Sequence, residues 1–193
     1  MTRPRLWLAV AALALGASAP FVGSPFRNAR GMIDVDELSR MVAHEEDHVT
    51  ALELAQWIKD RSGVRILDLR PRAQFDSLRI PGAERVTIDS LTGIGLSSGD
   101  TIVLYSEAGA HAAQAWVFLR ALGFRHVFFL RGGIYEWIDQ VLSPTLAVNP
   151  SDAERLAFAR AAPLSRYFGG LPRAGVPRGE QAKSVAQIRR RGC

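Results

Sequence analysis

The sequence contains a single cysteine, Cys193, among its 193 residues. One thiol cannot form a disulfide within the chain, so an intramolecular disulfide is excluded as a source of stability. The thiol is free, paired with a second molecule, or used in chemistry. The three arginines at positions 189–191 favour its thiolate form and so raise its reactivity.

Histidine is also scarce, with four in the chain. His44 and His48 have the spacing of the His-Glu-x-x-His zinc-protease motif, which requires both side chains on one face of a continuous helix. We expect this segment to leave a helix and enter a strand, and neither His111 nor His126 is an evident third ligand. The sequence therefore predicts a charged connector here, no metal site and no cofactor.

Acidic residues are absent from the first thirty positions. Arg3 and Arg5 precede an apolar run, 6–19, that ends in Ala-Ser-Ala, which is the layout of a secretory signal. Pro20 disfavours cleavage there, and the apolar run that continues past it is barely long enough to cross a bilayer. We expect residues 1–22 to be a signal peptide or an uncleaved N-terminal membrane anchor. The domain that follows is expected to be exported and periplasmic, and the lack of a cysteine after the apolar run excludes a lipoprotein anchor.

The net charge of +5 is unevenly distributed. Residues 149–193 contain nine Lys and Arg against three Asp and Glu, whereas residues 31–148 contain 11 basic and 16 acidic residues. Basic segments bind nucleic acid or anionic lipid in many proteins. Composition favours a solvated, partly disordered extension over 143–193, with lipid contact as an alternative and nucleic-acid binding not expected.

Apolar patterning predicts an α/β domain over residues 49–142, preceded by a linker and N-terminal helix over 23–48. Strands are expected at 64–69, 101–105 and 127–130, and helices after the capping residues Asp34 and Thr50, over 112–122 and from Gly132 onward. Alternation of strands and helices indicates a parallel sheet with helices on both faces. Beyond it, Ser151 and Glu154 form a capping box for one more helix, and the chain after Gly169-Gly170 is expected to be loose.

A tight corner is expected where the strand 101–105 runs into the next helix. Such a corner points backbone N–H groups at one spot, which suits an anion or a thiolate. The side chain at the mouth of this corner belongs to Ser106. The loop residues that we expect to line a binding site are Ser106, Glu107, Ala108, Gly109, Ala110 and His111.

Three ordered segments between 49 and 142 resemble a rhodanese domain. The first combines Asp68-x-Arg70 with Ile80-Pro81-Gly82-Ala83, the second is the strand that ends at Ser106 with Gly109 three residues on, and the third is the Gly-Gly-Ile-Tyr-Glu-Trp sequence at 132–137. The resemblance implies a single rhodanese-like domain in which a loop cysteine carries a sulfane sulfur as a persulfide. It also implies that Asp68 and Arg70 lie near the active loop, where a hydrogen bond from Arg70 would hold the loop in shape.

Ser106 occupies the position of that cysteine. A hydroxyl cannot form a stable analogue of a persulfide, and its pKa lies far above that of a thiol. Glu107 would in addition repel an anionic substrate, although His111, if protonated, would restore some positive charge. We therefore expect no sulfurtransferase activity at Ser106 and an exported binding or regulatory module, whose partner is a protein or a small anionic or sulfur ligand.

Two other chemistries are alternatives to this interpretation. Cys193 could be the working thiol of a sulfur carrier or sulfurtransferase if the basic extension brought it back to the Ser106 loop. A hydrolase with Ser106 as nucleophile is disfavoured, because the surroundings are not Gly-x-Ser-x-Gly and His111 lacks an evident orienting acid.

Overall fold

The computed structural model of the chain describes Trp7 and residues 34–180. The expected signal segment, apart from Trp7, and the thiol of Cys193 lie outside the described residues. Within the described part, no helix combines the length and apolar character needed to cross a membrane.

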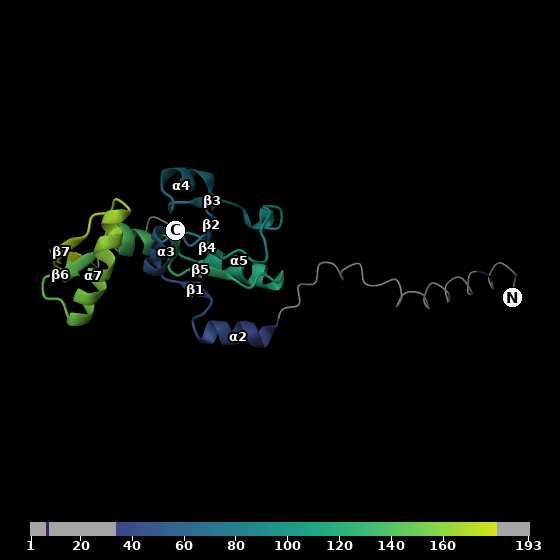
Figure 1. The fold of residues 1–193 in the computed structure, drawn as a ribbon, viewed down its shortest axis with the longest axis horizontal. Helices are drawn as coiled ribbons and strands as arrows, with labels where there is room; N and C mark the ends of the chain where they lie inside the picture. Colours follow the sequence, from purple (N-terminus) through teal and green to yellow (C-terminus); the bar gives the residue numbers. More distant parts are fainter. Residues whose placement is uncertain (1–6, 8–33, 181–193) are drawn as a thin grey trace. The chain divides into compact units, whose positions relative to one another are not determined.

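A five-stranded parallel sheet forms the centre of the fold (Figure 1). Its strand order is β1-β5-β4-β2-β3, and every neighbouring pair is parallel. β4 lies between β5 and β2, and all four of its residues are buried, as is typical of a strand covered on both faces. The strands are β1 (His48–Val49), β2 (Arg65–Asp68), β3 (Ala83–Arg85), β4 (Ile102–Tyr105) and β5 (Val127–Leu130).

Helices cover both faces of this sheet, as the sequence predicts. On one face, Val103 and Tyr105 of β4 pack in a core with residues of α3 and α6. On the other face, Ile102 and Leu104 pack with α5, and residues of α2 add to that core. The helical elements are α2 (Val35–Ala43), α3 (Ala51–Lys59), α4 (Arg72–Ser77), η2 (Ile88–Ser90), α5 (Ala110–Ala121), α6 (Gly133–Trp137) and the π-helical turn η3 (Ile138–Leu142).

Side-chain caps fix where the first two of these helices begin. The Asp34 carboxylate accepts the backbone N–H of Glu37 at 2.9 Å, which caps α2. Thr50 and Glu53 form a reciprocal capping box at the start of α3. Both starts agree with the prediction, because the caps depend only on residues a few positions apart.

The segment after residue 143 is more ordered than expected as far as Glu180. It contains β6 (Thr145–Ala147), α7 (Asp152–Tyr167) and β7 (Arg173–Val176), and β6 and β7 form a separate two-stranded parallel sheet. The prediction of a loose chain after Gly169-Gly170 was wrong for β7. Strand pairing across nearly thirty positions overrides a Gly-containing local sequence that on its own favours a loop.

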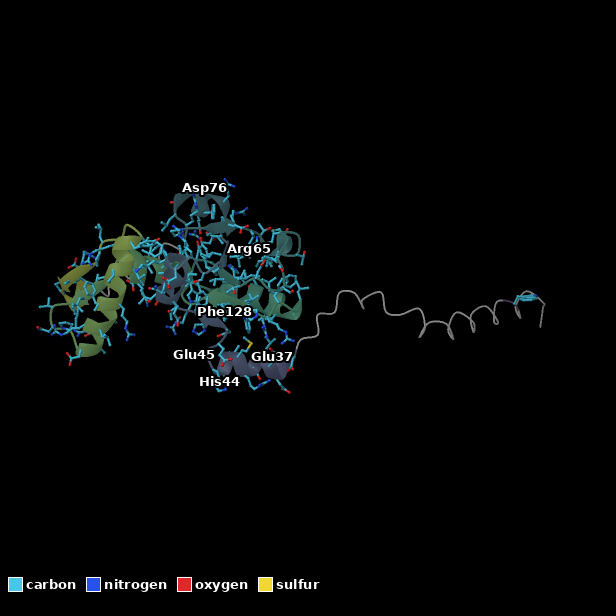
Figure 2. All side chains as sticks on the ribbon, in the orientation of Figure 1. Glu37, His44, Glu45, Arg65, Asp76 and Phe128 are labelled. Carbon is cyan, nitrogen blue, oxygen red and sulfur yellow. The ribbon has the colours of Figure 1, made fainter. Side chains whose placement is uncertain are left out.

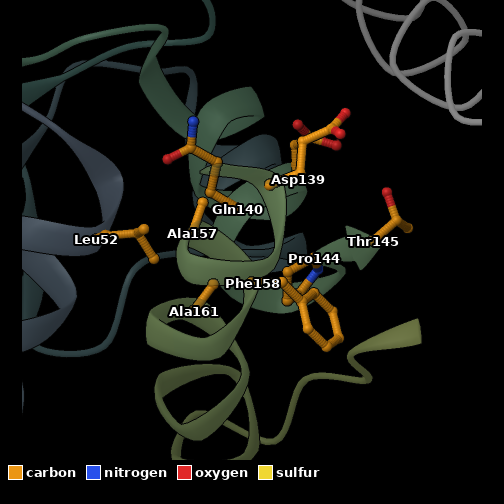
Figure 3. Close-up of a pocket in the computed structure, with 9 residues that line it drawn as sticks. Leu52, Asp139, Gln140, Pro144, Thr145, Ala157, Phe158 and Ala161 are labelled. Carbon is orange, nitrogen blue, oxygen red and sulfur yellow. The ribbon is translucent and has the colours of Figure 1, made fainter. Parts of the chain in front are cut away.

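α7 joins the core of the central domain. Leu164 is buried in the cluster that includes Trp137, and the Phe168 ring packs edge-on against Trp137 with ring centroids 5.1 Å apart. α7 also contacts α3 and η3. A small cavity of about 260 Å³ remains between α7, η3 and β6, where Asp139, Thr145 and Phe158 are among the lining residues (Figure 3).

Candidate functional site

The loop after β4 emerges at the carboxyl edge of the sheet, where ligands bind in open parallel sheets. Ser106 directly follows the last residue of β4, and α5 begins four residues later at Ala110. Gly109 caps α5 with a φ of 95°, a left-handed conformation that side chains rarely adopt. The structure therefore contains the corner that the sequence predicts, and the conformation of Gly109 allows it.

Both oxygens of Ser106 are engaged within the corner. The Ser106 side chain is buried, with the residue 3% exposed, and its Oγ accepts the backbone N–H of Gly109 at 3.2 Å. The Ser106 carbonyl accepts the N–H of Ile134 at 2.9 Å. The hydroxyl therefore closes the loop on itself, in the way that Ser side chains commonly do in turns.

Gly133 holds the same loop from the side of α6. A Cβ atom at position 133 would lie 2.3 Å from the Ser106 carbonyl oxygen and 2.5 Å from that of Glu107. Gly133 also has a φ of 59°. The resemblance singled out the Gly-Gly pair, but only the structure explains the second glycine, whose missing side chain lets the two backbones touch.

Arg70 makes different contacts from those we predicted. Its guanidinium forms a buried ion pair with Asp68, with Nη2 2.6 Å from Oδ2, and the same nitrogen donates to the Leu78 carbonyl at 2.6 Å. None of its hydrogen bonds in the described residues reaches the loop 106–111. Burial tends to lower the pKa of Arg70, but the hydrogen bonds and charge of Asp68 outweigh it and raise that pKa.

Tyr105 connects this ion pair to the Ser106 loop. Its hydroxyl accepts the N–H of Ile80 at 3.3 Å, and its ring lies beneath the Arg70 guanidinium at 5.4 Å. Burial raises the pKa of the Tyr105 phenol, and the hydrogen-bonded Asp68 carboxylate raises it further. The phenol is therefore neutral, and Asp68 and Arg70 support Ser106 indirectly, through the residue that precedes it.

Glu107 points toward α4, a contact that the sequence did not predict. One carboxylate oxygen, Oε1, accepts a hydrogen bond from the side-chain amide of Gln74. These two residues line a cavity of about 370 Å³ beside the loop, whose other walls come from α4, α6 and η3. Gln74 is 33 positions from Glu107, and no local pattern connects them.

The remaining loop residues face outward. Ala108, Ala110 and His111 are exposed, with His111 in the first turn of α5. No described side chain provides an orienting acid or a base paired with Ser106, as a hydrolase would need.

The His-Glu-x-x-His sequence does not form a zinc site. His44 follows the last residue of α2 and Glu45 continues the turn (Figure 2), whereas His48 lies in β1 with its Nδ1 2.8 Å from Asp47 Oδ1. Among residues 34–180, no group of ligating side chains is arranged to hold a metal ion.

Comparisons with known proteins agree with this fold. The family profile of the Rhodanese-like domain matches residues 50–140. The probable adenylyltransferase/sulfurtransferase MoeZ of Mycobacterium tuberculosis is 27% identical over 120 residues, which are 57% of this chain and 31% of that protein. The chain thus spans about a third of the length of the curated relatives it matches.

Solved structures include similar domains. The rhodanese-like domain of an Anabaena sp. protein is 30% identical with a TM-score of 0.43, and the match covers 47% of this chain and 72% of that one. The rhodanese-related protein of Thermoplasma volcanium is 25% identical with a TM-score of 0.42, and the match covers 47% and 89%. With the sheet, the helices and the matched profile together, residues 50–140 of this chain are a rhodanese-like domain.

Proposed function

We propose that the rhodanese-like domain does not transfer sulfur at Ser106 and instead serves as a binding or regulatory module for a protein partner. The observation that carries this proposal is the state of Ser106, a buried hydroxyl that accepts the N–H of Gly109. An oxygen in that place offers neither the thiolate nor the polarisable atom that sulfane transfer requires. The loop keeps its shape, and the Ser106 side chain serves as a structural cap within it.

The chemistry of sulfur transfer explains why a sulfur atom is needed at position 106. A thiolate attacks the outer sulfur of thiosulfate, a new S–S bond forms, and the old S–S bond breaks as sulfite leaves. Cyanide then removes the outer sulfur as thiocyanate and regenerates the thiolate. A serine hydroxyl remains protonated at neutral pH and has no stable product for the first step, so we expect the cycle never to begin at Ser106.

We also propose that the domain functions outside the cytoplasm. The support is the arrangement of Arg3 and Arg5 before the apolar run 6–19. Cellular fractionation of the tagged full chain tests this. Recovery in the cytoplasmic fraction would contradict it.

A second candidate function uses Cys193 as a sulfur carrier. Its support is that Cys193 is the only thiol in the chain and closely follows three arginines, which favour a thiolate. A further support is the similarity to MoeZ, which is described as a probable adenylyltransferase/sulfurtransferase.

A thiosulfate:cyanide assay on four versions of the full chain separates the two functions. The versions are the unchanged protein, Ser106→Cys, Cys193→Ala and Ser106→Ala. We expect no thiocyanate from the unchanged protein. Turnover by Ser106→Cys would show that the loop can still stabilise a thiolate and that only the sulfur atom is missing.

Two outcomes contradict the first proposal. Turnover by the unchanged protein that survives Cys193→Ala but not Ser106→Ala would place sulfur transfer at Ser106. Turnover that Cys193→Ala abolishes and Ser106→Ala preserves would establish the sulfur-carrier function in its place.

A further inference from the structure

The cavity beside the Ser106 loop lies between α4, Glu107 and the start of α6, and has a volume of about 370 Å³. Ala73, Leu78, Ile134 and Ile138 provide apolar wall. A space of this size and lining accommodates an aliphatic chain that ends in a polar group.

The cavity has an uncompensated negative charge. Arg70 and Glu107 are the charged residues that line it. Arg70 is 6% exposed, and its guanidinium is already paired with the fully buried carboxylate of Asp68. The Glu107 carboxylate has only the neutral side-chain amide of Gln74 as a hydrogen-bond partner among the described residues.

Gln74, which lines the cavity, also has one buried hydrogen-bond acceptor that lacks a donor. The Gln74 amide nitrogen donates to Glu107, which fixes the amide so that Oε1 is the other terminal atom. This Oε1 is buried and has no hydrogen-bond partner within the described part of the chain. A buried acceptor without a donor is costly, so a ligand that supplies N–H groups is favoured.

We infer that this cavity binds an ammonium or guanidinium group on an aliphatic stem, the chemistry of a lysine or arginine side chain. The charged end meets Glu107 and Gln74 Oε1, and the stem lies against the apolar wall. The inference rests on the proposed binding function and specifies its ligand. It replaces the anionic ligand that the corner alone suggests, since Glu107 repels an anion.

Two sources could supply such a side chain. One is a partner protein with an exposed lysine or arginine. The other is this chain itself, which carries Lys183 and the three arginines at 189–191. Both present the same chemistry, and a variant of the basic segment distinguishes them.

The test is an NMR titration of the full, ¹⁵N-labelled chain with Nα-acetyl-lysine amide and Nα-acetyl-arginine amide. We expect saturable shifts at Glu107, Ala108 and the Gln74 side-chain amide. Nα-acetyl-norleucine amide, which keeps the stem without the charge, should bind at least about tenfold more weakly, and thiosulfate should leave these signals unchanged.

Matched variants show which residues are responsible for binding the lysine probe. Glu107→Gln should weaken lysine binding about tenfold or more, whereas Asp76→Asn removes the same charge from the exposed face of α4 and should change it little. Gln74→Leu should weaken binding as well, with the spectrum confirming that each variant is folded. The inference is overturned if norleucine binds as well as lysine, if thiosulfate saturates the same signals, or if Glu107→Gln and Asp76→Asn behave alike.

A chain that combines Lys183→Gln, Arg189→Gln, Arg190→Gln and Arg191→Gln identifies the source. Tighter binding of the lysine probe by this variant assigns the cavity to the chain's own basic segment, and unchanged binding assigns it to a partner. Sulfur transfer is measured on the same samples. Thiocyanate production at Ser106 would contradict the proposed function. The preference of the cavity for a cation is tested separately, by the NMR titration.

Discussion

At the scale of single residues, the site depends on close backbone contact more than on reactive side chains. Ser106 caps its own loop, and Gly133 lets the backbone of α6 lie directly against the Ser106 and Glu107 carbonyls. Asp68 and Arg70 form a buried ion pair, and the Arg70 guanidinium lies over the Tyr105 ring. The contribution of such residues to stability can be measured by comparing a substitution there with the same substitution at a control position.

Gly133→Ala should destabilise the domain more than Gly82→Ala. Both glycines have positive φ, and a methyl group in that conformation costs about 1–2 kcal/mol. At Gly82 nothing lies within 4 Å of the added Cβ, whereas at Gly133 it meets two carbonyl oxygens, which should add about 1–3 kcal/mol. Urea denaturation of both variants measures the difference, and equal losses would show that the loop does not depend on this contact.

Arg70→Met should cost about 3–5 kcal/mol, because it leaves the Asp68 carboxylate buried without its partner. Arg72→Met removes an exposed ion pair with Asp76 and should cost less than about 1 kcal/mol. If Arg70→Met does not fold, the double variant Asp68→Asn with Arg70→Met removes both charges and should recover much of the loss. The free energy of unfolding from urea denaturation measures all three, and similar losses for Arg70→Met and Arg72→Met would contradict the argument.

At the scale of elements, helix starts are set by residues close in sequence and strand partners by residues far apart. The capping box of Ser151 and Glu154 begins α7 as predicted, and Arg178 adds a charge contact to Glu154 at 3.0 Å. β7, which has no comparable local pattern, forms by pairing with β6.

The start of α7 should depend on acid pH. Hydrogen bonds from Arg178, and then from Ser151, lower the pKa of Glu154 from 4.5 to about 2. The folded-state pKa is the lower one, so this contribution is complete above about pH 4.5 and is lost as the pH falls toward 2. An NMR titration of the Glu154 carboxyl carbon should show a midpoint near the lower value, and Arg178→Gln should raise it. A midpoint near 4.5 in the unchanged protein would contradict the contact.

At the scale of the whole described structure, α7 belongs to the same core as the central sheet. Leu164 is 6% exposed in the cluster with Trp137, and Phe168 packs on the same indole ring. A helix that shares a core should unfold together with that core.

Leu164→Ala should therefore destabilise the whole domain by about 2–5 kcal/mol. Leu156→Ala changes a 55% exposed side chain on the same helix and should stay within about 0.5 kcal/mol. Tryptophan fluorescence and far-UV circular dichroism should give coincident transitions in both variants. Two separate transitions would mean that α7 unfolds independently of the sheet.

The sequence by itself determined the α/β class, the helix starts at Asp34, Thr50 and Ser151, and the corner that places Ser106 before α5. Those features follow from apolar periodicity, short-range caps and the conformational freedom of Gly109, all of which act over a few neighbouring positions. Only the tertiary structure decided which distant residues meet there. It joined Gln74 to Glu107, directed Arg70 to Leu78 instead of the loop, and paired β6 with β7, because such contacts depend on how the packed elements align in space.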